Sequence, residues 1–352
     1  MEKNLSRRTF FKMSTATTAA LALPAVVSSH DSFAAVPSGL GPAIPAVQQQ
    51  NGNVKASAAL RPGNSDDFTR AYFDSLMLET RYLDADIPST KMELFGTVFD
   101  TPVMTAALSH LRSNNGRNGM VEYAKGAALC NAVHWMGMGE DRELEEVVAT
   151  GARTIKIIKP HADNAEVFRR IRHAVNTGCF AIGMDIDHPF NGKGGYDNVL
   201  GLPMRPKSAD EIKSFVKAAD VPFIVKGVLS VSDAVKCMNA GAAGIVISHH
   251  GSRVKYSIPP LMAIEAIAEA VKGKMKIFVD CGIVSGMDAY KCLALGADAV
   301  SVGRHLIPMV SEGAEAVADR IKEMTSELSG VMCATGVKSL EEMDPTVIHK
   351  TI

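Results

Sequence analysis

The sequence carries no excess of either charge. Its 352 residues include 37 Lys and Arg against 38 Asp and Glu, for a formal net charge of −1. This balance gives no electrostatic case for nucleic acid or an anionic membrane surface as a partner. The six cysteines form no Cys-x-x-Cys pair and no Cys/His spacing, so neither a redox pair nor a metal site is indicated. With 47% hydrophobic residues, the chain has the composition of a soluble globular protein.

The N-terminus lacks an apolar run long enough to span a bilayer. Residues 6–12 read SRRTFFK and precede the weakly apolar MSTATTAALALPAVVSS and then DSFAA. Paired arginines, a short apolar stretch and a small-x-small site are typical of a twin-arginine export signal. We therefore predict a signal peptide over residues 1–34, the twin-arginine export machinery as a partner, and a periplasmic or otherwise exported location.

A second segment lacks any apolar period. Residues 35–66 are rich in Pro, Gly, Gln and Asn, which predicts a flexible linker. From Asp67 the composition turns globular and stays so to the end. The sequence thus predicts a single folded domain over residues 67–352.

Within this domain, short runs rich in β-branched residues alternate with amphipathic helical patterns. Eight such units over this length favour a (β/α)8 TIM barrel. A doubly wound sheet is the alternative, but the sequence lacks the Gly-rich dinucleotide turn that usually follows an early strand of that fold. The predicted strands cover residues 102–108, 128–135, 153–159, 179–187, 222–228, 243–250, 276–282 and 299–304.

Polar side chains gather at one end of these strands. The carboxyl ends of barrel strands form the active site of TIM-barrel enzymes, whereas the opposite ends here carry little chemistry. This asymmetry indicates an enzyme rather than a structural barrel. The polar residues at the carboxyl ends are His134, Lys159, Asp185, Asp187, His188, Lys226, His249, His250, Asp280 and Arg304.

The last two strands end in glycine-containing loops, DCGIVSG at 280–286 and VGRHL at 302–306. Loops at these positions commonly bind phosphate through main-chain N–H groups, and Arg304 adds a charged two-point contact. Lys226 lies in the apolar strand FIVKGV, where an ammonium is expensive to bury without an anionic partner. A phosphate-bearing ligand at the mouth of the barrel is therefore expected.

Two long segments carry a family resemblance. Residues 223–253 (FIVKGVLSVSDAVKCMNAGAAGIVISHHGSR) and 279–307 (VDCGIVSGMDAYKCLALGADAVSVGRHLI) resemble the signature of the FMN-dependent 2-hydroxy acid oxidases and dehydrogenases. The resemblance implies FMN as cofactor, a small carboxylate substrate such as an L-2-hydroxy acid, and a homo-oligomer. It leaves oxygen, a quinone and a cytochrome open as the electron acceptor.

The resemblance also implies roles for individual residues. His250 is expected to be the base that takes the substrate proton, Asp187 the carboxylate that orients it, and Arg253 the group that binds the substrate carboxylate. Lys226 is expected to face the N1/O2 region of the flavin. The other residues expected to contact FMN are Ala106, Ala107, Ser248, Asp280, Gly282, Gly303 and Arg304.

The chain also departs from the family pattern at several positions. His249 and Ser252 replace Asn and Gly, Lys156 and Ile158 replace Gln and Tyr, and Val284 and the Lys193–Gly194 pair stand where arginines are usual. His249, Lys156 and Lys193 are candidate substrate contacts, and His249 has two other interpretations, a hydrogen-bond donor near the flavin and a packed polar residue. His134, His188 and Trp135 are further pocket candidates. These departures leave open a reductase or isomerase acting on a larger substrate, or a flavin-binding protein without catalysis.

Overall fold

The computed structural model describes residues 63–113, 116–271 and 273–351. The predicted signal peptide, residues 1–34, and most of the predicted linker lie outside this part of the chain. The first helix is α1 (Ser65–Asp74), and Asn64 caps it by accepting a hydrogen bond from the Asp66 N–H at 3.4 Å. Helix α1 therefore begins inside the segment that we predicted as a linker.

Eight parallel strands form a nearly closed barrel, in the order β4-β13-β12-β11-β10-β7-β6-β5. The ring closes where the Thr105 N–H donates to the Val133 carbonyl at 3.2 Å and Leu108 pairs with Met136 in a parallel bridge. The predicted TIM barrel is confirmed, and the alternative of an open doubly wound sheet is wrong. The strands are β4 (Val103–Thr105), β5 (His134–Met136), β6 (Thr154–Ile158), β7 (Ala181–Asp185), β10 (Phe223–Val228), β11 (Gly244–Ile247), β12 (Lys276–Val279) and β13 (Ala299–Val302).

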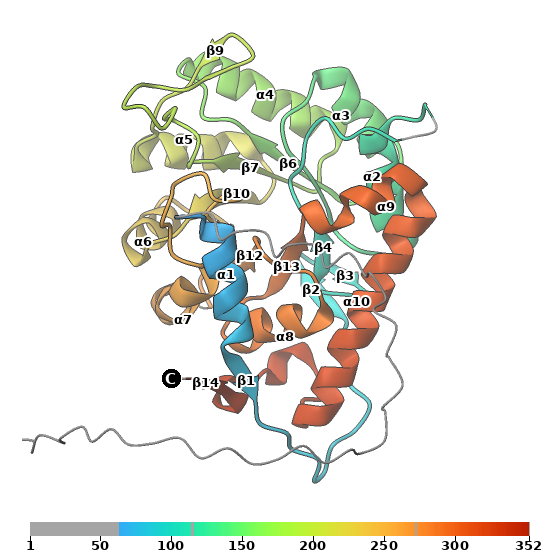
Figure 1. Ribbon diagram of the computed structural model, residues 1–352. Coiled ribbons are helices and arrows are strands. Elements are labelled where there is room, and N and C mark those ends of the chain that lie inside the picture. Colours follow the sequence, from blue (N-terminus) through green and yellow to red (C-terminus); the bar gives the residue numbers. More distant parts are fainter. Residues whose placement is uncertain (1–62, 114–115, 272, 352) are drawn as a thin grey trace, which may run out of the picture. The chain divides into compact units, whose positions relative to one another are not determined.

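Helices follow the barrel strands and surround them (Figure 1). Ser208, Ser230 and Ser285 begin three of these helices, each accepting a hydrogen bond from an N–H of the first turn. The helices are α2 (Gly119–Leu129), α3 (Asp141–Val148), α4 (Asn164–Thr177), α5 (Ala209–Ala219), α6 (Val231–Asn239), α7 (Pro260–Val271), α8 (Gly286–Ala294), η1 (Arg304–Leu306), α9 (Ile307–Glu312) and α10 (Ala314–Thr335).

One strand boundary differs clearly from its prediction. The run at 128–135 begins too early, because Ala128 and Leu129 form the last turn of α2 and the strand starts only at His134. Alanine favours helix strongly, and the preceding Ala124 and Ala127 bury their side chains on the inner face of the same helix. The apolar character of the run thus belongs mostly to a buried helix.

The barrel interior is apolar at its amino end and polar at its carboxyl end. Trp135 packs edge-on against Phe278, with ring centroids 5.3 Å apart. The hairpin of β2 (Met92–Leu94) and β3 (Thr97–Phe99) adds Leu94 and Phe99 to the same buried cluster. Phe99 also packs against Phe180, directly before β7, so this hairpin covers the amino ends of the strands.

Smaller elements complete the described part of the chain. Strand β1 (Leu76–Leu78) pairs antiparallel with β14 (Ile348–Lys350), and short 3-10 turns η2 (Leu340–Glu342) and η3 (Pro345–Val347) precede β14. The hairpin of β8 (Asn198–Val199) and β9 (Leu202–Pro203) is inserted between β7 and α5. None of the helices described is long and apolar enough to cross a membrane.

Candidate active site

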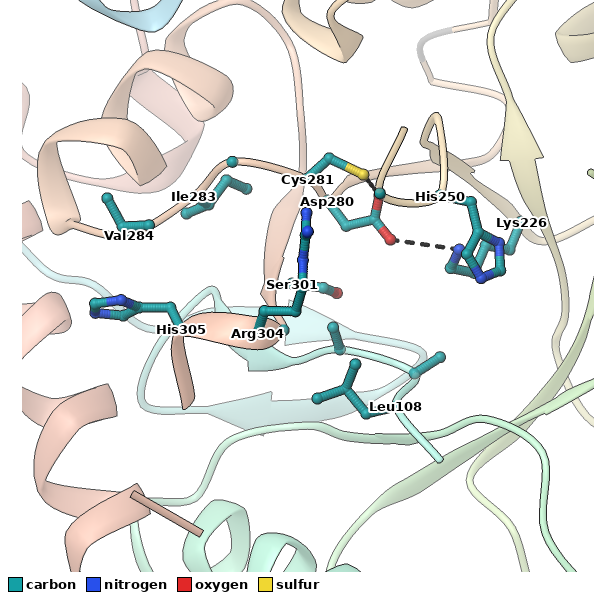
Figure 2. Close-up of a pocket in the computed structure, with 15 residues that line it drawn as sticks. Leu108, Lys226, His250, Asp280, Cys281, Ile283, Val284, Ser301, Arg304 and His305 are labelled. Atoms are coloured by element: carbon teal, nitrogen blue, oxygen red, sulfur yellow. Dashed lines mark hydrogen bonds and ion pairs between the residues drawn. The ribbon is translucent and has the colours of Figure 1, made fainter. Parts of the chain in front are cut away.

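A cavity of about 500 Å³ opens at the carboxyl ends of the strands. Figure 2 shows Lys226 and His250 close together on one side, and Val284 and His305 on the other. Its size suits a small cofactor, since such pockets usually measure about 300–1,000 Å³. The lining residues are Ala106, Ala107, Leu108, Lys226, His250, Gly251, Asp280, Cys281, Gly282, Ile283, Val284, Ser301, Gly303, Arg304 and His305.

The turns after β12 and β13 form one end of the cavity. Cys281 and Gly282 both adopt left-handed backbone conformations, with φ of 73° and 78°. A Cβ on Gly303 would lie 3.3 Å from the Cβ of Ala106, so the glycine keeps this side of the cavity open. Arg304 completes the turn, but Asp66 of α1 holds its guanidinium through two hydrogen bonds of 3.0 and 2.9 Å. The sequence pattern did not indicate this partner.

Lys226 is buried in a group of opposite charges. Its Nζ lies 3.4 Å from Oδ1 of Asp185, 3.5 Å from Oδ2 of Asp280 and 3.4 Å from Oγ of Ser248. Burial by itself lowers the pKa of this lysine, but the carboxylates of Asp280 and Asp185 outweigh it and raise the pKa above the ordinary value. Lys226 therefore remains a cation, and the structure brings it together with Ser248 and Asp280, two other residues expected to contact FMN.

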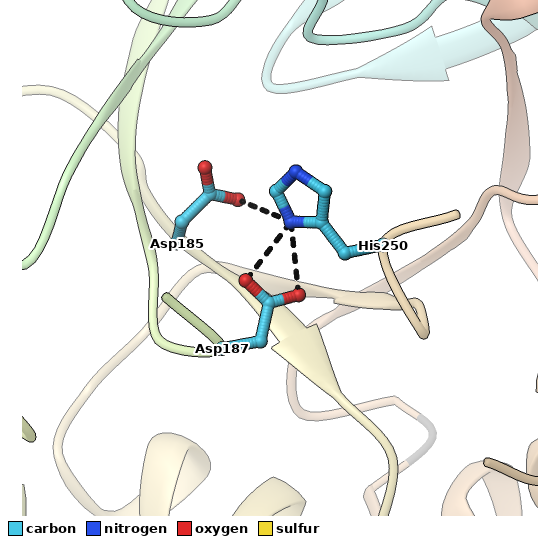
Figure 3. Close-up of side chains that lie close together, drawn as sticks. All are labelled: Asp185, Asp187 and His250. Atoms are coloured by element: carbon cyan, nitrogen blue, oxygen red, sulfur yellow. Dashed lines mark hydrogen bonds and ion pairs between the residues drawn. The ribbon is translucent and has the colours of Figure 1, made fainter. Parts of the chain in front are cut away.

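His250 lies against two carboxylates of the β7 end (Figure 3). Its Nδ1 is 3.0 and 3.1 Å from the two oxygens of Asp187 and 3.8 Å from Oδ1 of Asp185. Its Nε2 points away from both (Figure 3). The histidine backbone has a φ of 53°, followed by Gly251 at 63° and Ser252 at 67°. This left-handed turn after β11 presents the imidazole to the cavity, and such backbone conformations are common at functional sites.

A further buried ion pair lies at the mouth, and no role was predicted for it. Lys159 Nζ lies 2.6 Å from Oδ2 of Asp185, and both side chains are buried. Burial raises the pKa of Asp185, but Lys226 and Lys159 outweigh it and hold the pKa well below its ordinary range. The sequence did indicate that acidic groups gather here. Asp185 and Asp187 are two positions apart in an extended segment, so their side chains point to the same face.

Two residues predicted as substrate contacts, Lys156 and Lys193, do not line the cavity. Ile155 and Ile157 fill the barrel interior, so Lys156 between them points outward and donates to the carbonyl of Gly137 at 2.5 Å. Burial lowers the pKa of Lys156 to about 8. Lys193 is exposed in the loop before β8. The direction of Lys156 depends on the register of β6, where a shift of one residue exchanges the inner and outer faces.

His249 is packed away from the cavity. Its Nε2 lies 2.8 Å from Oγ1 of Thr69, and its Nδ1 accepts the Ser252 N–H at 3.1 Å, so both ring nitrogens are engaged. Burial lowers its pKa. Among the three interpretations, this geometry favours the packed polar residue. His134 and Trp135 do not line the cavity either, because both are fully buried in the barrel wall and core.

Arg253 lies close to His250 but is already bound. Its guanidinium contacts His188, Phe190 and Asp197 of the loop after β7, and it does not line the cavity. The ring of His188 in turn lies against that of His250, with centroids 4.8 Å apart. The role predicted for Arg253, binding of the substrate carboxylate, stays a prediction, and the sequence did not indicate Asp197 as its partner.

Comparison with known proteins assigns this arrangement to a family. The chain matches the family described as FMN-dependent dehydrogenase over residues 57–211 and 199–350. It belongs to this family. Residues 4–24 of this flavoenzyme also match the signal sequence of the twin-arginine translocation pathway.

The relatives of this flavoenzyme are oxidases of 2-hydroxy acids. It is 27% identical to L-lactate oxidase from Roseobacter sp. (strain GAI101), over 74% of this chain and 79% of that protein. Glycolate oxidase 3 from Arabidopsis thaliana is 25% identical, over 81% and 86% of the two chains. A solved mandelate oxidase with 3,3-difluoro-2-hydroxy-3-phenylpropionic acid matches with a TM-score of 0.74 at 25% identity, over 82% and 91% of the two chains. The chain is thus an oxidoreductase with FMN as its cofactor.

The residues of the cavity fit FMN. Arg304 and the glycine turns offer a cation and main-chain N–H groups at one end, and Lys226 offers a second cation at the other. Ala106, Ala107 and Ile283 add apolar lining to the cavity. Among the described residues, the buried hydroxyl of Ser301 has no hydrogen-bond partner although it lines the cavity, as expected of a group that contacts a ligand.

Proposed function

We propose that this enzyme oxidises the C–H bond of an α-hydroxy carbonyl compound, with His250 as the base and FMN as the electron acceptor. The observation that supports it most directly is the His250–Asp187 pair, which lies at the cavity mouth with the Nδ1 to Oδ1 distance at 3.0 Å. Relatives that the chain resembles are named as oxidases of lactate, glycolate and 4-hydroxymandelate.

Asp187 sets the tautomer of the histidine. With its carboxylate on Nδ1, the neutral ring carries its proton there and offers the lone pair of Nε2 to the substrate hydroxyl. When Nε2 takes the hydroxyl proton, the imidazolium that forms lies between the charges of Asp187 and Asp185. General base catalysis of this kind contributes about 10²–10⁴-fold to rate. Bound FMN supplies the acceptor for the two electrons of the C–H bond.

Lys226 keeps a positive charge beside the base. Because Asp185 and Asp280 hold it protonated, it can stabilise negative charge at the neighbouring end of the cofactor. At the opposite end, Gly282, Gly303 and Arg304 would hold the phosphate, and Arg304 would exchange Asp66 for it. We further propose that the enzyme works outside the inner membrane, since residues 4–24 match the signal sequence of the twin-arginine translocation pathway.

The test is an anaerobic screen of α-hydroxy compounds for bleaching of the flavin absorbance in the purified holoenzyme. Reduction by at least one such compound, with the 2-oxo compound as product, is the expected result. Reduction by a nicotinamide donor alone would assign a reductase instead. A flavin that no donor reduces would overturn the proposal in favour of a binding protein. Admitting air after reduction then tests oxygen as the final acceptor.

A further inference from the structure

His305 lines the cavity at the end formed by the turns after β12 and β13, away from His250 (Figure 2). It directly follows Arg304 in η1, and Val284 of the neighbouring turn lines the same end. The side chain of Val284 is apolar, and Asp66 holds the guanidinium of Arg304. His305 is therefore a polar group at this end to which the proposed oxidation gives no role.

Arg320 of α10 holds the imidazole of His305 in place, although it does not line the cavity itself. Its Nε–H donates to Nε2 of His305 at 3.0 Å, and its Nη2 donates to the carbonyl of Val284 at 2.7 Å. Its Nη1 lies against the carboxylates of Glu323 and Glu327. The Arg320 side chain is only 15% exposed and each of its three nitrogens has a partner, so the position of the guanidinium is fixed.

The contact with Arg320 decides which nitrogen of His305 carries the proton. An arginine in a protein always keeps its protons, so Nε2 of the histidine must accept and the neutral ring carries its proton on Nδ1. Among the described residues, none accepts a hydrogen bond from this Nδ1. The ring thus keeps one N–H donor available to a ligand in the cavity.

His305 is neutral at pH 7. Burial lowers its pKa below the ordinary value, and so does the charge of Arg320. The carboxylates of Glu327, Asp288 and Glu323 oppose this shift but do not outweigh it. The ring therefore acts as a hydrogen-bond donor at Nδ1 and not as a second cation beside Arg304.

We propose that His305 donates its Nδ1–H to the phosphate of FMN and that Arg320 is the positioning residue that orients the ring for this contact. Two successive residues of η1, Arg304 and His305, then contact the same group. A hydrogen bond to an ionised acceptor is roughly twice as strong as one between neutral groups, so this donor contributes measurably to cofactor affinity. The proposal concerns the cofactor alone and does not depend on the oxidation proposed above.

The experiment compares FMN with riboflavin, which has the same ring system and ribityl chain but no phosphate. Quenching of flavin fluorescence on titration with the full-length apoprotein gives both Kd values. A Gln amide takes the place of Nε2 and can still accept from Arg320, but it offers no donor in the place of Nδ1. His305→Gln should therefore weaken FMN binding about 10–100-fold, the usual range for a hydrogen bond to a charged group, and change riboflavin binding less than about twofold.

His305→Asn is the matched variant, because an Asn amide takes the place of Nδ1 and can donate there. It should keep FMN affinity within about fivefold of the wild type, since the donor to the charged group remains.

Arg320→Met tests the positioning residue. Without the Arg320 N–H on Nε2, the proton of His305 is shared between the two ring nitrogens, and FMN binding should weaken about 3–10-fold with riboflavin binding unchanged. Lys322→Met is the control for charge, because it removes a cation from the same helix while Lys322 pairs with Asp319 and does not line the cavity. Its FMN affinity should equal that of the wild type.

Thermal unfolding is measured for each apoprotein, and His305→Leu repeats the test if the Gln variant does not fold. Unchanged FMN binding in His305→Gln would overturn the proposal. Equal losses of FMN and riboflavin affinity would also overturn it, since His305 would then shape the cavity and not contact the phosphate. Wild-type FMN affinity in Arg320→Met would overturn the role of Arg320.

Discussion

The Arg304 guanidinium and the Asp66 carboxylate form a two-point ion pair between the last barrel strand and helix α1. Nη1 lies 3.0 Å from Oδ2, and Nη2 lies 2.9 Å from Oδ1. The hydrogen bonds that Arg304 donates to Asp66 raise the pKa of Arg304 above its ordinary value. Because arginine binds carboxylate and phosphate through the same fork, Asp66 and the FMN phosphate compete for it.

Asp66→Asn is therefore expected to bind FMN more tightly than the wild type. The expected gain is about tenfold in Kd, equivalent to about 1.4 kcal/mol. It is measured by quenching of FMN fluorescence on titration with apoprotein. Riboflavin, which lacks the phosphate, should show no gain, and neither should Asp74→Asn, which breaks the ion pair with Arg70 on the same helix. Equal or weaker FMN binding by Asp66→Asn would contradict the competition.

Replacement of the base should separate chemistry from cofactor binding. His250→Gln is expected to retain FMN but to slow substrate-driven flavin reduction about 10²–10⁴-fold, because no group then takes the hydroxyl proton. His249→Asn is the neighbouring control. Its side-chain oxygen can still accept the Ser252 N–H, so reduction should stay within about threefold of the wild type. Single-turnover bleaching, after bound FMN is quantified, measures both. The reverse pattern would move the base to His249.

Lys226 is expected to be as important for folding as for the flavin. Lys226→Met removes the cation between Asp185 and Asp280. Removal of one partner from a buried ion pair leaves an uncompensated charge and lowers the unfolding free energy by about 3–5 kcal/mol. Urea unfolding of the apoprotein measures this cost. The second substitution Asp280→Asn should restore part of it by removing a buried charge, and the exposed Lys236→Met should change stability by less than about 0.5 kcal/mol. An additive loss in the double variant would argue against direct coupling.

The decrease in unfolding free energy on acidification should depend on His134. Burial lowers its pKa to about 3 from 6.5, so the unfolded chain binds more protons than the folded one between these values. The unfolding free energy therefore rises with pH up to about 6.5 and falls on acidification, by up to about 1.4 kcal/mol per pH unit.

His134→Asn keeps an acceptor or donor for Thr105, which lies 3.0 Å from Nδ1, but it cannot titrate. Its unfolding free energy should therefore fall by less between pH 6.5 and pH 4 than the unfolding free energy of the wild type. Substitution of an exposed histidine, His110→Asn, should leave the wild-type slope unchanged. Parallel pH profiles for the wild type and His134→Asn would refute this origin of the acid sensitivity.

Much of the barrel and part of its site could be predicted from the order of residues. The alternation of short strands with amphipathic helices predicts a repeated β/α unit. In a barrel of such units, the carboxyl ends of the strands meet around one opening. Asp187 and His250 follow strands and Lys226 lies in the second half of one, so their convergence needed no knowledge of packing. The outward direction of Lys156 could not be predicted, because strand period alone does not say which of two alternating faces points inward.

The sequence by itself thus determined the repeat, the polar end of the barrel and the residues that converge on His250. Only the tertiary structure decided which partners these residues have. Asp66 reaches Arg304 across 238 positions of the chain, Thr69 reaches His249 across 180, and Asp197 reaches Arg253 across 56. Such pairs depend on where a helix or loop docks to within an ångström or two, since hydrogen bonds and ion pairs weaken steeply with distance and angle. Periodicity and spacing carry no information on that scale.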